Sequence, residues 1–357
     1  MSVTEVAARA GVSIATVSRV LNRSRPVNPE IAERVLLAVS ELGYSPRRSR
    51  QRRRARAMQT QGSTIAIVGL GQTYRGWIEA PMIGAFVGAI TRAAQTQQMA
   101  VVMTEMPDPN ELSPVLRRRD IAGAIVHIAG TMNSSAARVL ARTVPTVGIM
   151  GGQLAPVDMD YVGVDNNAVG YVAGRYLAEH GCKRVGFIST AVNWAFLRMR
   201  AHGFVAAAYE SGGHPELFVV SDPSRLAAVY GNSVVQCGEL SSLLDAVAMA
   251  KPDGLFISRD EETVEVYRGL YSRGITPGKD IKVISCDNDS VRLSVLHPRP
   301  PSISLEPNYM AQLAVRRLQW RIKHPEAPPI RILVNPRLEL GDKLLEPMIH
   351  GEVYDSI

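Results

Sequence analysis

Residues 3–22 read VTEVAARAGVSIATVSRVLN, and this stretch decides the fold of the N-terminal part of the chain. The apolar residues at positions 3, 6, 7 and 10 recur at helical spacing. Gly11 can adopt the left-handed conformation that ends a helix, and Ser13 is a favoured cap for the start of the next helix. Residues 14–22 continue as a second helix with Val17 toward the core. Two short helices joined by a Gly-x-Ser turn predict a helix-turn-helix.

A third helix is expected after Asn28, which can cap it, while Pro29 stands at the first position, where its missing N–H is harmless. Its apolar stripe is Ile31, Val35, Val39 and Leu42, and Gly43 ends it. The second helix of such a unit fits the major groove of DNA, with its N-terminal residues at the base edges. Short helical hairpins also occur as mere packing units, so the pattern alone leaves that alternative open.

The basic charge of the chain is concentrated in its first sixth. The 357 residues carry a net charge of +7. Residues 1–60 contain twelve arginines, no lysine and four acidic residues, a net +8, so the remaining chain carries about −1. This asymmetry indicates a polyanionic partner for the N-terminal segment and favours nucleic acid over an anionic lipid surface or a solvated tail.

The segments 3–7, 10–13, 15–22 and 42–46 (Leu-Gly-Tyr-x-Pro) resemble the DNA-binding head of the lactose/galactose repressor (LacI/GalR) family. The resemblance implies a transcriptional regulator, more often a repressor than an activator, that binds a double-stranded DNA operator. It also implies that Ile14, Ala15 and Arg19 read bases, since Arg19 can donate two hydrogen bonds to guanine and Ala15 can offer a methyl contact. A core position is the alternative for Ile14.

The resemblance further implies phosphate contacts, which set the register on DNA without reading its sequence. The residues expected to make them are Ser13, Thr16, Ser18 and Asn22. Local capping or bonding to the backbone is the alternative for Thr16 and Ser18.

Residues 47–61 form an expected linker, of which residues 47–58 read RRSRQRRRARAM. In the family this place holds a short hinge that folds on DNA and pushes a leucine into the minor groove, and the present segment has no leucine. The residues expected at the minor groove are Arg50, Arg52, Arg53, Arg54, Ala55, Arg56 and Met58. Because like charges repel, we expect the free segment to be disordered and its binding to DNA to be strongly salt-dependent. A merely flexible linker is the alternative.

Short apolar runs alternate with helix-length stretches from residue 62 onward, which predicts parallel sheets covered by helices on both faces. The motifs YVGVDN (161–166), RMRAHGF (198–204) and VISCDN (283–288) resemble the same family and imply a periplasmic-binding-protein-like core. The expected fold is therefore α/β, with an all-α helix-turn-helix head at 1–46, a two-lobed core of doubly wound parallel sheets at 62–345, and a tail at 346–357. Family topology implies lobe one at about 62–162 and 290–320, and lobe two at about 163–289 and 321–345.

Ligands of open α/β sheets bind at the carboxyl ends of the strands. The resemblance places Arg200, Asp287 and Asn288 there as contacts for a small effector, which is expected to be a carbohydrate. It also implies a homodimer, whose two heads contact a nearly palindromic operator. The lobes are expected to clamp this effector between them.

Four further residues are candidates for the effector site. Arg259 and Asp260 follow a predicted strand where the family usually has Asn-Asp, so the guanidinium can select a more acidic effector or instead pair with Asp260 or Glu262. Trp77 and Trp194 can offer a flat face to a sugar ring, or be core residues.

No motif in the chain indicates catalysis, a metal or a cofactor. The three cysteines lie far apart without C-x-x-C spacing, and no Walker loop, H-E-x-x-H or G-x-S-x-G occurs. This cysteine usage and the absence of an apolar run of bilayer length and of a secretion signal favour a cytoplasmic protein with no membrane association. A solute-binding protein of the same core fold, an enzyme on that fold, and a regulator without an effector are the alternatives.

Overall fold

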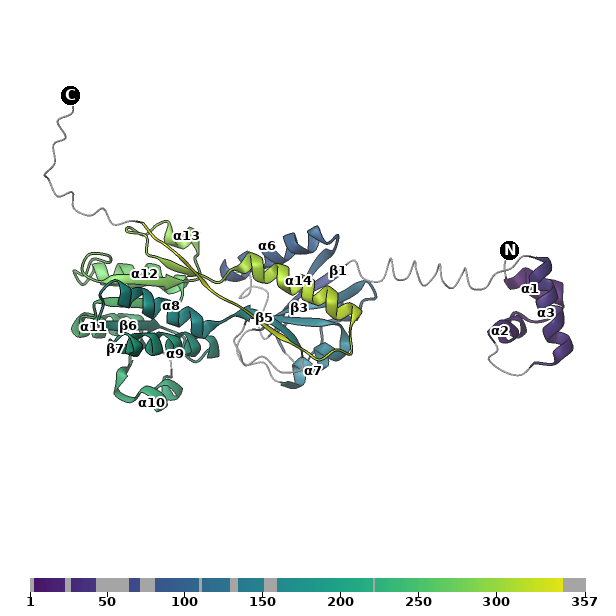
Figure 1. The fold of residues 1–357 in the computed structure, drawn as a ribbon, viewed down its shortest axis with the longest axis horizontal. Helices are drawn as coiled ribbons and strands as arrows, with labels where there is room; N and C mark the ends of the chain where they lie inside the picture. The colour runs from purple at the N-terminus through teal and green to yellow at the C-terminus, as the bar shows by residue number, and fades with distance from the viewer. Residues whose placement is uncertain are drawn as a thin grey trace, which may run out of the picture. The chain divides into compact units, whose positions relative to one another are not determined.

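The computed structural model describes residues 3–22, 27–42, 64–70, 81–108, 111–128, 134–150, 159–220 and 222–342. The chain divides into two compact units, residues 1–62 and residues 63–357, and each is described by itself (Figure 1). None of the helices within the described ranges combines the length and the apolar character that a membrane crossing needs.

The first unit is the expected helix-turn-helix with a third helix. Its elements are α1 (Val3–Ala10), α2 (Ile14–Asn22) and α3 (Pro29–Glu41). Val6, Val17 and Val35 are fully buried and form the centre of its core. Gly11 has a φ of 64°, a conformation in which a side chain would be strained. The Ser13 hydroxyl accepts a hydrogen bond from the Thr16 backbone N–H at 3.2 Å, so α2 begins with the predicted cap.

The second unit begins with a six-stranded parallel sheet in the order β12-β5-β4-β3-β1-β2. Its strands are β1 (Thr64–Leu70), β2 (Ala100–Met106), β3 (Ile121–Ile128), β4 (Thr146–Ile149), β5 (Asp160–Val164) and β12 (Arg331–Val334). Helices α6 (Pro81–Thr96) and α14 (Pro307–Lys323) pack on one face, and η1 (Pro114–Arg117) and α7 (Ser134–Thr143) on the other. Burial on both faces explains the continuous apolar runs of these strands.

The second sheet of this unit has seven strands in the order β13-β11-β10-β9-β6-β7-β8. They are β6 (Arg184–Ser189), β7 (His214–Val219), β8 (Val234–Gln236), β9 (Gly254–Ile257), β10 (Lys282–Cys286), β11 (Ser302–Ser304) and β13 (Arg337–Glu339), of which β13 alone is antiparallel to its neighbour. Its helices are α8 (Asn166–Glu179), α9 (Ala195–Glu210), α10 (Ser224–Tyr230), η2 (Gly231–Ser233), α11 (Leu240–Ala250), α12 (Asp260–Tyr271) and α13 (Ser290–Leu293). The expected α/β class with two parallel-dominated sheets is confirmed.

Helices α8 and α9 touch through their backbones. A Cβ added to Gly170 of α8 would lie 1.8 Å from the carbonyl oxygen of Arg200, and one added to Gly203 of α9 would lie 1.9 Å from that of Asn167. No side chain larger than hydrogen fits at either position, so these glycines set the distance between the two helices.

The chain passes between the two sheets three times, and the observed division differs from the one expected from the family. Residues 302–304 were expected in lobe one, yet β11 pairs with β10 of the seven-stranded sheet. Residues 331–334 were expected in lobe two, yet β12 pairs with β5 of the six-stranded sheet. The physical reason is the strand pairing itself. β11 adds a parallel strand beside β10, and the chain returns to the six-stranded sheet only afterwards, with α14 and β12.

Asp160, the first residue of β5, anchors the return of the chain from α14 to β12. Its fully buried carboxylate accepts hydrogen bonds from Arg317 at 2.9 Å, from Arg321 Nε at 2.7 Å and from the Ile330 backbone N–H at 2.8 Å. Burial would raise the pKa of Asp160, but the hydrogen bonds from Arg321 and Arg317 outweigh it and lower the pKa below its ordinary value. Arg321 also donates to the carbonyl oxygens of Ala327 and Pro328. One carboxylate therefore orders the segment between α14 and β12.

Candidate functional site

The outer face of α2 carries the residues expected to read bases. Ile14 is 48% exposed, and Ala15 and Arg19 are exposed as well, whereas Val17 is fully buried. Ile14 is therefore a surface residue and not a core residue. Arg19 makes no ion pair with the described residues, which leaves its five N–H donors available for a base or a phosphate.

The residues expected to bind phosphates lie at the start of α2 and along it. Ser13 Oγ lies 2.9 Å from Thr16 Oγ1, so the local capping considered as the alternative for Thr16 is present in the structure. Ser18 is exposed on the second turn. Asn22 is the last residue of α2, and its side chain lies outside the described residues.

The linker candidates also lie outside the residues that the structure describes. They are Arg50, Arg52, Arg53, Arg54, Ala55, Arg56 and Met58. The same holds for Trp77 and for the tail at 346–357, so these assignments stay predictions from the sequence.

A polar cluster lies at the carboxyl ends of three adjacent strands of the seven-stranded sheet. We call it the Arg200 cluster, and its members are Asn166, Thr190, Arg200, Ser258, Arg259, Asp260, Glu262, Asp287, Asn288 and Ser302. Thr190 directly follows β6, Ser258 follows β9 and Asp287 follows β10. Because β6, β9 and β10 are neighbours, their ends bring these polar groups together, as in other ligand sites of parallel sheets.

Arg200 is the centre of this cluster and is only 2% exposed. Its two terminal nitrogens donate to Asp287 Oδ1 at 3.3 and 3.4 Å, and its Nε donates to Asn166 Oδ1 at 3.1 Å. A terminal nitrogen also donates to the carbonyl oxygen of Ser258, and the Phe196 ring centre lies 5.4 Å from the guanidinium carbon. A buried charge is costly unless it is paired and hydrogen-bonded. Arg200 meets both conditions through these partners.

Asp287 and Asn288 have strained backbones. Their φ angles are 111° and 51°, in the left-handed region that residues with a side chain seldom adopt. The turn is held by the Asp287 N–H, which donates to the Ile303 carbonyl at 2.9 Å, and by the Asn288 N–H, which donates to Ser302 Oγ at 3.0 Å. Strain of this kind costs on the order of 1–3 kcal/mol per residue and collects at ligand sites.

Asp260 is a buried acid with a perturbed pKa. Burial and the neighbouring charge of Asp287 raise the pKa of Asp260 from 3.8 to about 7, against the opposing hydrogen bonds from the Asp289 N–H and the Ser302 hydroxyl. Ser302 Oγ donates to both carboxylate oxygens at 3.1 Å, and the Asp289 N–H donates at 2.7 Å. Burial also raises the pKa of Asp287, with Arg200 and Arg259 opposing. The cluster therefore holds two carboxylates that resist ionising together.

Arg259 is paired with acids of its own helix. Its terminal nitrogens lie 2.6 Å from Glu262 and 2.9 Å from Glu261, so the pairing with Glu262 considered from the sequence is present, whereas no ion pair with Asp260 is formed. The Nε of Arg259 is buried without a hydrogen-bond partner. The half-buried Trp194 ring centre lies 5.9 Å from its guanidinium carbon. The arginine thus keeps one donor for a further group.

Sequence reasoning missed five residues of this neighbourhood: Asn166, Thr190, Ser258, Ser302 and the adjacent Phe196. It considered Glu262 only as an ion-pair partner of Arg259. The run Arg-Asp-Glu-Glu at 259–262 carried a signal for Glu262, since the third residue after Arg259 lies on the same face of a helix. His127 is buried near the carboxyl end of β3, its Nδ1 has no partner, and burial lowers its pKa to about 4. His127 is therefore neutral at pH 7.

Among the described residues, no three His, Cys, Asp or Glu side chains are placed to hold a metal ion. The buried polar groups instead form donor and acceptor pairs suited to the hydroxyls of a small polar ligand. A helix-turn-helix unit together with a two-sheet α/β core and a polar cluster at its strand ends defines the class of DNA-binding regulators with a ligand-binding core.

Comparison with known proteins agrees with this class. Residues 2–47 match the model of the bacterial regulatory proteins of the lacI family, and residues 175–342 match the periplasmic binding protein-like domain. The chain therefore joins a DNA-binding domain of the lacI family to a periplasmic-binding-protein-like domain, and the curated proteins that it resembles are named transcriptional repressors and regulators.

One relative is the ribose operon repressor of Escherichia coli strain K12, which is 27% identical over 94% of this chain and 97% of its own length. A solved complex of the transcriptional regulator CelR with cellobiose covers 96% of this chain and 99% of its own, with a TM-score of 0.63 and 22% identity. The lac repressor dimer bound to operator and the anti-inducer ONPF covers 96% and 98%, with a TM-score of 0.62 and 18% identity. These structures share the fold of the present chain.

Proposed function

We propose that the protein represses transcription, that it binds its operator as a homodimer, and that a small carbohydrate bound at the Arg200 cluster changes its affinity for DNA. The observation that carries the effector part is the buried Arg200–Asp287 pair at the strand ends, with Asp287 and Asn288 held in a strained turn. Such a group of fixed donors and acceptors is prepared for a ligand before the ligand arrives.

On DNA, α2 enters the major groove with Ile14, Ala15 and Arg19 at the base edges. Their exposure supports this placement, as does the burial of Val17 on the opposite face. Backbone phosphates are bound by Ser13, Thr16, Ser18 and Asn22, and the arginines at 50–56 add contacts in the minor groove. Two heads on a two-fold operator require a dimer, and the related lac repressor structure is a dimer on its operator.

In the core, a sugar hydroxyl both donates and accepts hydrogen bonds, so it suits the Arg200 cluster. The Asp287 carboxylate, whose side chain is 13% exposed, accepts from the hydroxyl, and Arg259 Nε donates to the ligand. Trp194 contributes the flat face against which a sugar ring packs. A ribose operon repressor and a cellobiose complex among the similar proteins favour a carbohydrate for this chain too.

The ligand regulates DNA binding only if its affinity differs between the DNA-competent and the DNA-incompetent state, and couplings of this kind are typically about 5–150-fold. Because the operator is chromosomal, we infer that the protein works in the cytoplasm.

The test has two stages. A selection from fragmented genomic DNA identifies the operator, and fluorescence anisotropy then measures its affinity while sugars and sugar acids are added one at a time. At least one sugar should change the affinity. The same sugar should have no effect on Arg200→Lys, because lysine keeps the charge but loses the forked contacts to Asp287 and Asn166.

Arg175→Lys is the matched control, because Arg175 is exposed on α8 and pairs with Glu179 at 2.9 Å. It should respond to the sugar as the natural protein does. An unchanged sugar response in Arg200→Lys would rule out the Arg200 cluster as the effector site, and a failure to select any DNA fragment would rule out operator binding.

A further inference from the structure

A cavity lies at the opposite end of the strands of the seven-stranded sheet from the Arg200 cluster. Its volume is about 660 Å³, within the range of small-molecule sites. Lys282, the first residue of β10, lines this cavity, whereas Asp287 follows the last residue of the same strand. A five-residue strand rises roughly 16 Å, so the two places are distinct.

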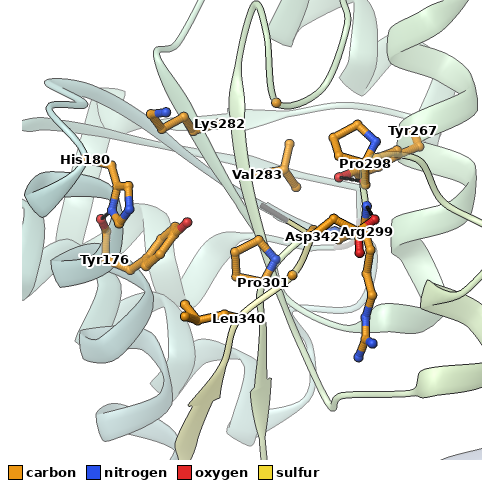
Figure 2. Close-up of a pocket in the computed structure, with 13 residues that line it drawn as sticks. Tyr176, His180, Tyr267, Lys282, Val283, Pro298, Arg299, Pro301, Leu340 and Asp342 are labelled. Atoms are coloured by element: carbon orange, nitrogen blue, oxygen red, sulfur yellow. Dashed lines mark hydrogen bonds between the residues drawn. The ribbon is translucent and has the colours of Figure 1, made fainter. Parts of the chain in front are cut away.

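The cavity has two facing walls (Figure 2). One wall is the end of α8, where the Tyr176 and His180 rings lie 4.1 Å apart between their centres and His180 Nδ1 lies 2.8 Å from the Tyr176 carbonyl oxygen. The opposite wall carries Pro298 and Arg299, and Pro301 lies between the walls in the view. Aromatic and proline rings on facing sides offer flat surfaces to a planar ligand.

The proline wall is fixed before any ligand binds. The Arg299 N–H donates to Asp342 Oδ2 at 3.0 Å, and the Asp342 N–H donates back to the Arg299 carbonyl at 3.1 Å. A Cβ added to Gly341 would lie 2.0 Å from the Arg299 carbonyl oxygen, so the two segments are in direct backbone contact. The Tyr267 hydroxyl supports the same wall by donating to the Pro298 carbonyl at 3.3 Å. The cavity is thus a preformed space.

The charges of the lining favour an anion. Lys282 is half-buried, and its ammonium has no hydrogen bond or ion pair within the described residues. Asp342, the acid of the lining, already accepts from the Arg299 backbone. Because Lys282 lines the cavity and has no counter-charge among those residues, a carboxylate that binds in the cavity would gain a charge-assisted hydrogen bond from its ammonium.

We propose that this cavity binds a small aromatic carboxylate, with its ring between the Tyr176–His180 pair and the prolines and its carboxylate on Lys282. The exposed apolar side chain of Leu340, 71% accessible at the rim, is the surface that the ring covers. The site is separate from the Arg200 cluster, although Arg299 of its wall donates to Asn288 of that cluster at 3.2 Å, and it gives the protein a second small-molecule input.

The experiment uses the full chain with labelled Leu and Val methyl groups, benzoate as the probe, and benzyl alcohol as its uncharged comparator. Benzoate should shift the methyl resonances of Val283 and Leu340, and benzyl alcohol should need a concentration about tenfold higher for the same shift. Lys282→Gln should weaken benzoate binding about tenfold, as expected for loss of one charge-assisted contact. Lys279→Gln, a change at an exposed lysine three residues away, should leave it unchanged.

Three results would overturn the proposal. They are the absence of any shift at Val283 and Leu340, equal affinity for benzoate in the Lys282→Gln and natural proteins, and shifts confined to methyl groups near the Arg200 cluster such as Leu197. An unchanged spectrum of Lys282→Gln without benzoate verifies that the variant is folded, so a weakened affinity is then assigned to the lost ammonium.

Discussion

Asp160 offers the sharpest test of the structural reasoning, through the single change Asp160→Asn. The carboxylate is fully buried and neutralises two guanidinium groups, those of Arg317 and Arg321, whose side chains are each 10% exposed. Asparagine has nearly the same shape, so the change removes a charge without leaving a cavity. What remains is a pair of positive charges that burial prevents water from solvating fully.

The expected cost follows from that imbalance. Breaking a buried ion pair by removing one partner destabilises a protein by about 3–5 kcal/mol, because the other charge is left uncompensated. Here two guanidiniums share the carboxylate, so the upper part of the range applies. For a unit of this size the melting temperature should fall by roughly 6–10 °C. The hydrogen bonds from Arg321 to the carbonyl oxygens at 324–328 partly stabilise its charge in the variant, but they supply no negative charge.

The assay is thermal unfolding followed by circular dichroism and checked by urea denaturation. Asp120→Asn is the matched control, because Asp120 pairs with Arg118 at 2.6 Å at an exposed place where water screens the charges. The control should have the same melting temperature as the natural protein. If Asp160→Asn also had that melting temperature, the description of Asp160 as the anchor between α14 and β12 would be wrong.

Three other outcomes are expected. Arg19→Ala should abolish the preference for operator over scrambled DNA in competition binding, because each lost base contact removes about 1–3 kcal/mol of discrimination. A retained preference would contradict the placement of α2 in the major groove. Replacing the five arginines at 50–56 by glutamine should reduce the slope of log affinity against log salt by about 0.9 for each lost phosphate contact, and an unchanged slope would show that the run does not touch DNA. Asp260→Asn should remove a pH dependence of stability: since the folded pKa is about 7 against an ordinary 3.8, the natural protein loses stability as pH rises through that interval, and denaturation midpoints at pH 5 and 8 should differ less in the variant. Equal pH dependence in both proteins would show that Asp260 does not titrate as described.

The head was predictable from the sequence because its signals are local. Gly11, Ser13 and Asn28 each act on backbone groups within a few residues, and the structure has the turn and both caps where they were expected. The alternating body also gave the α/β class, since each buried strand is a continuous apolar run.

The distribution of the last strands between the sheets was not predictable in the same way. β11 and β12 have three and four residues, too few for a periodic pattern. The partner of β12, β5, is distant in sequence, and the segment between β10 and β11 contains α13. The gathering of Arg200 with Asp287 was expected from motifs. The roles of Asn166 and Phe196 were not, because they depend on how α8 and α9 pack. For Arg259 the sequence allowed either a ligand contact or an ion pair, because the sequence does not determine the conformation of a side chain.

The backbone contact at Gly170 and Gly203 has a mechanical consequence. The backbones of α8 and α9 are in direct contact at these glycines, so we expect the two helices to move together. The first residue of α8, Asn166, comes only two residues after β5 of the other sheet, and the same Asn166 holds Arg200 on α9. A small tilt of α8 that starts where the chain leaves the six-stranded sheet should therefore also move the Arg200 guanidinium.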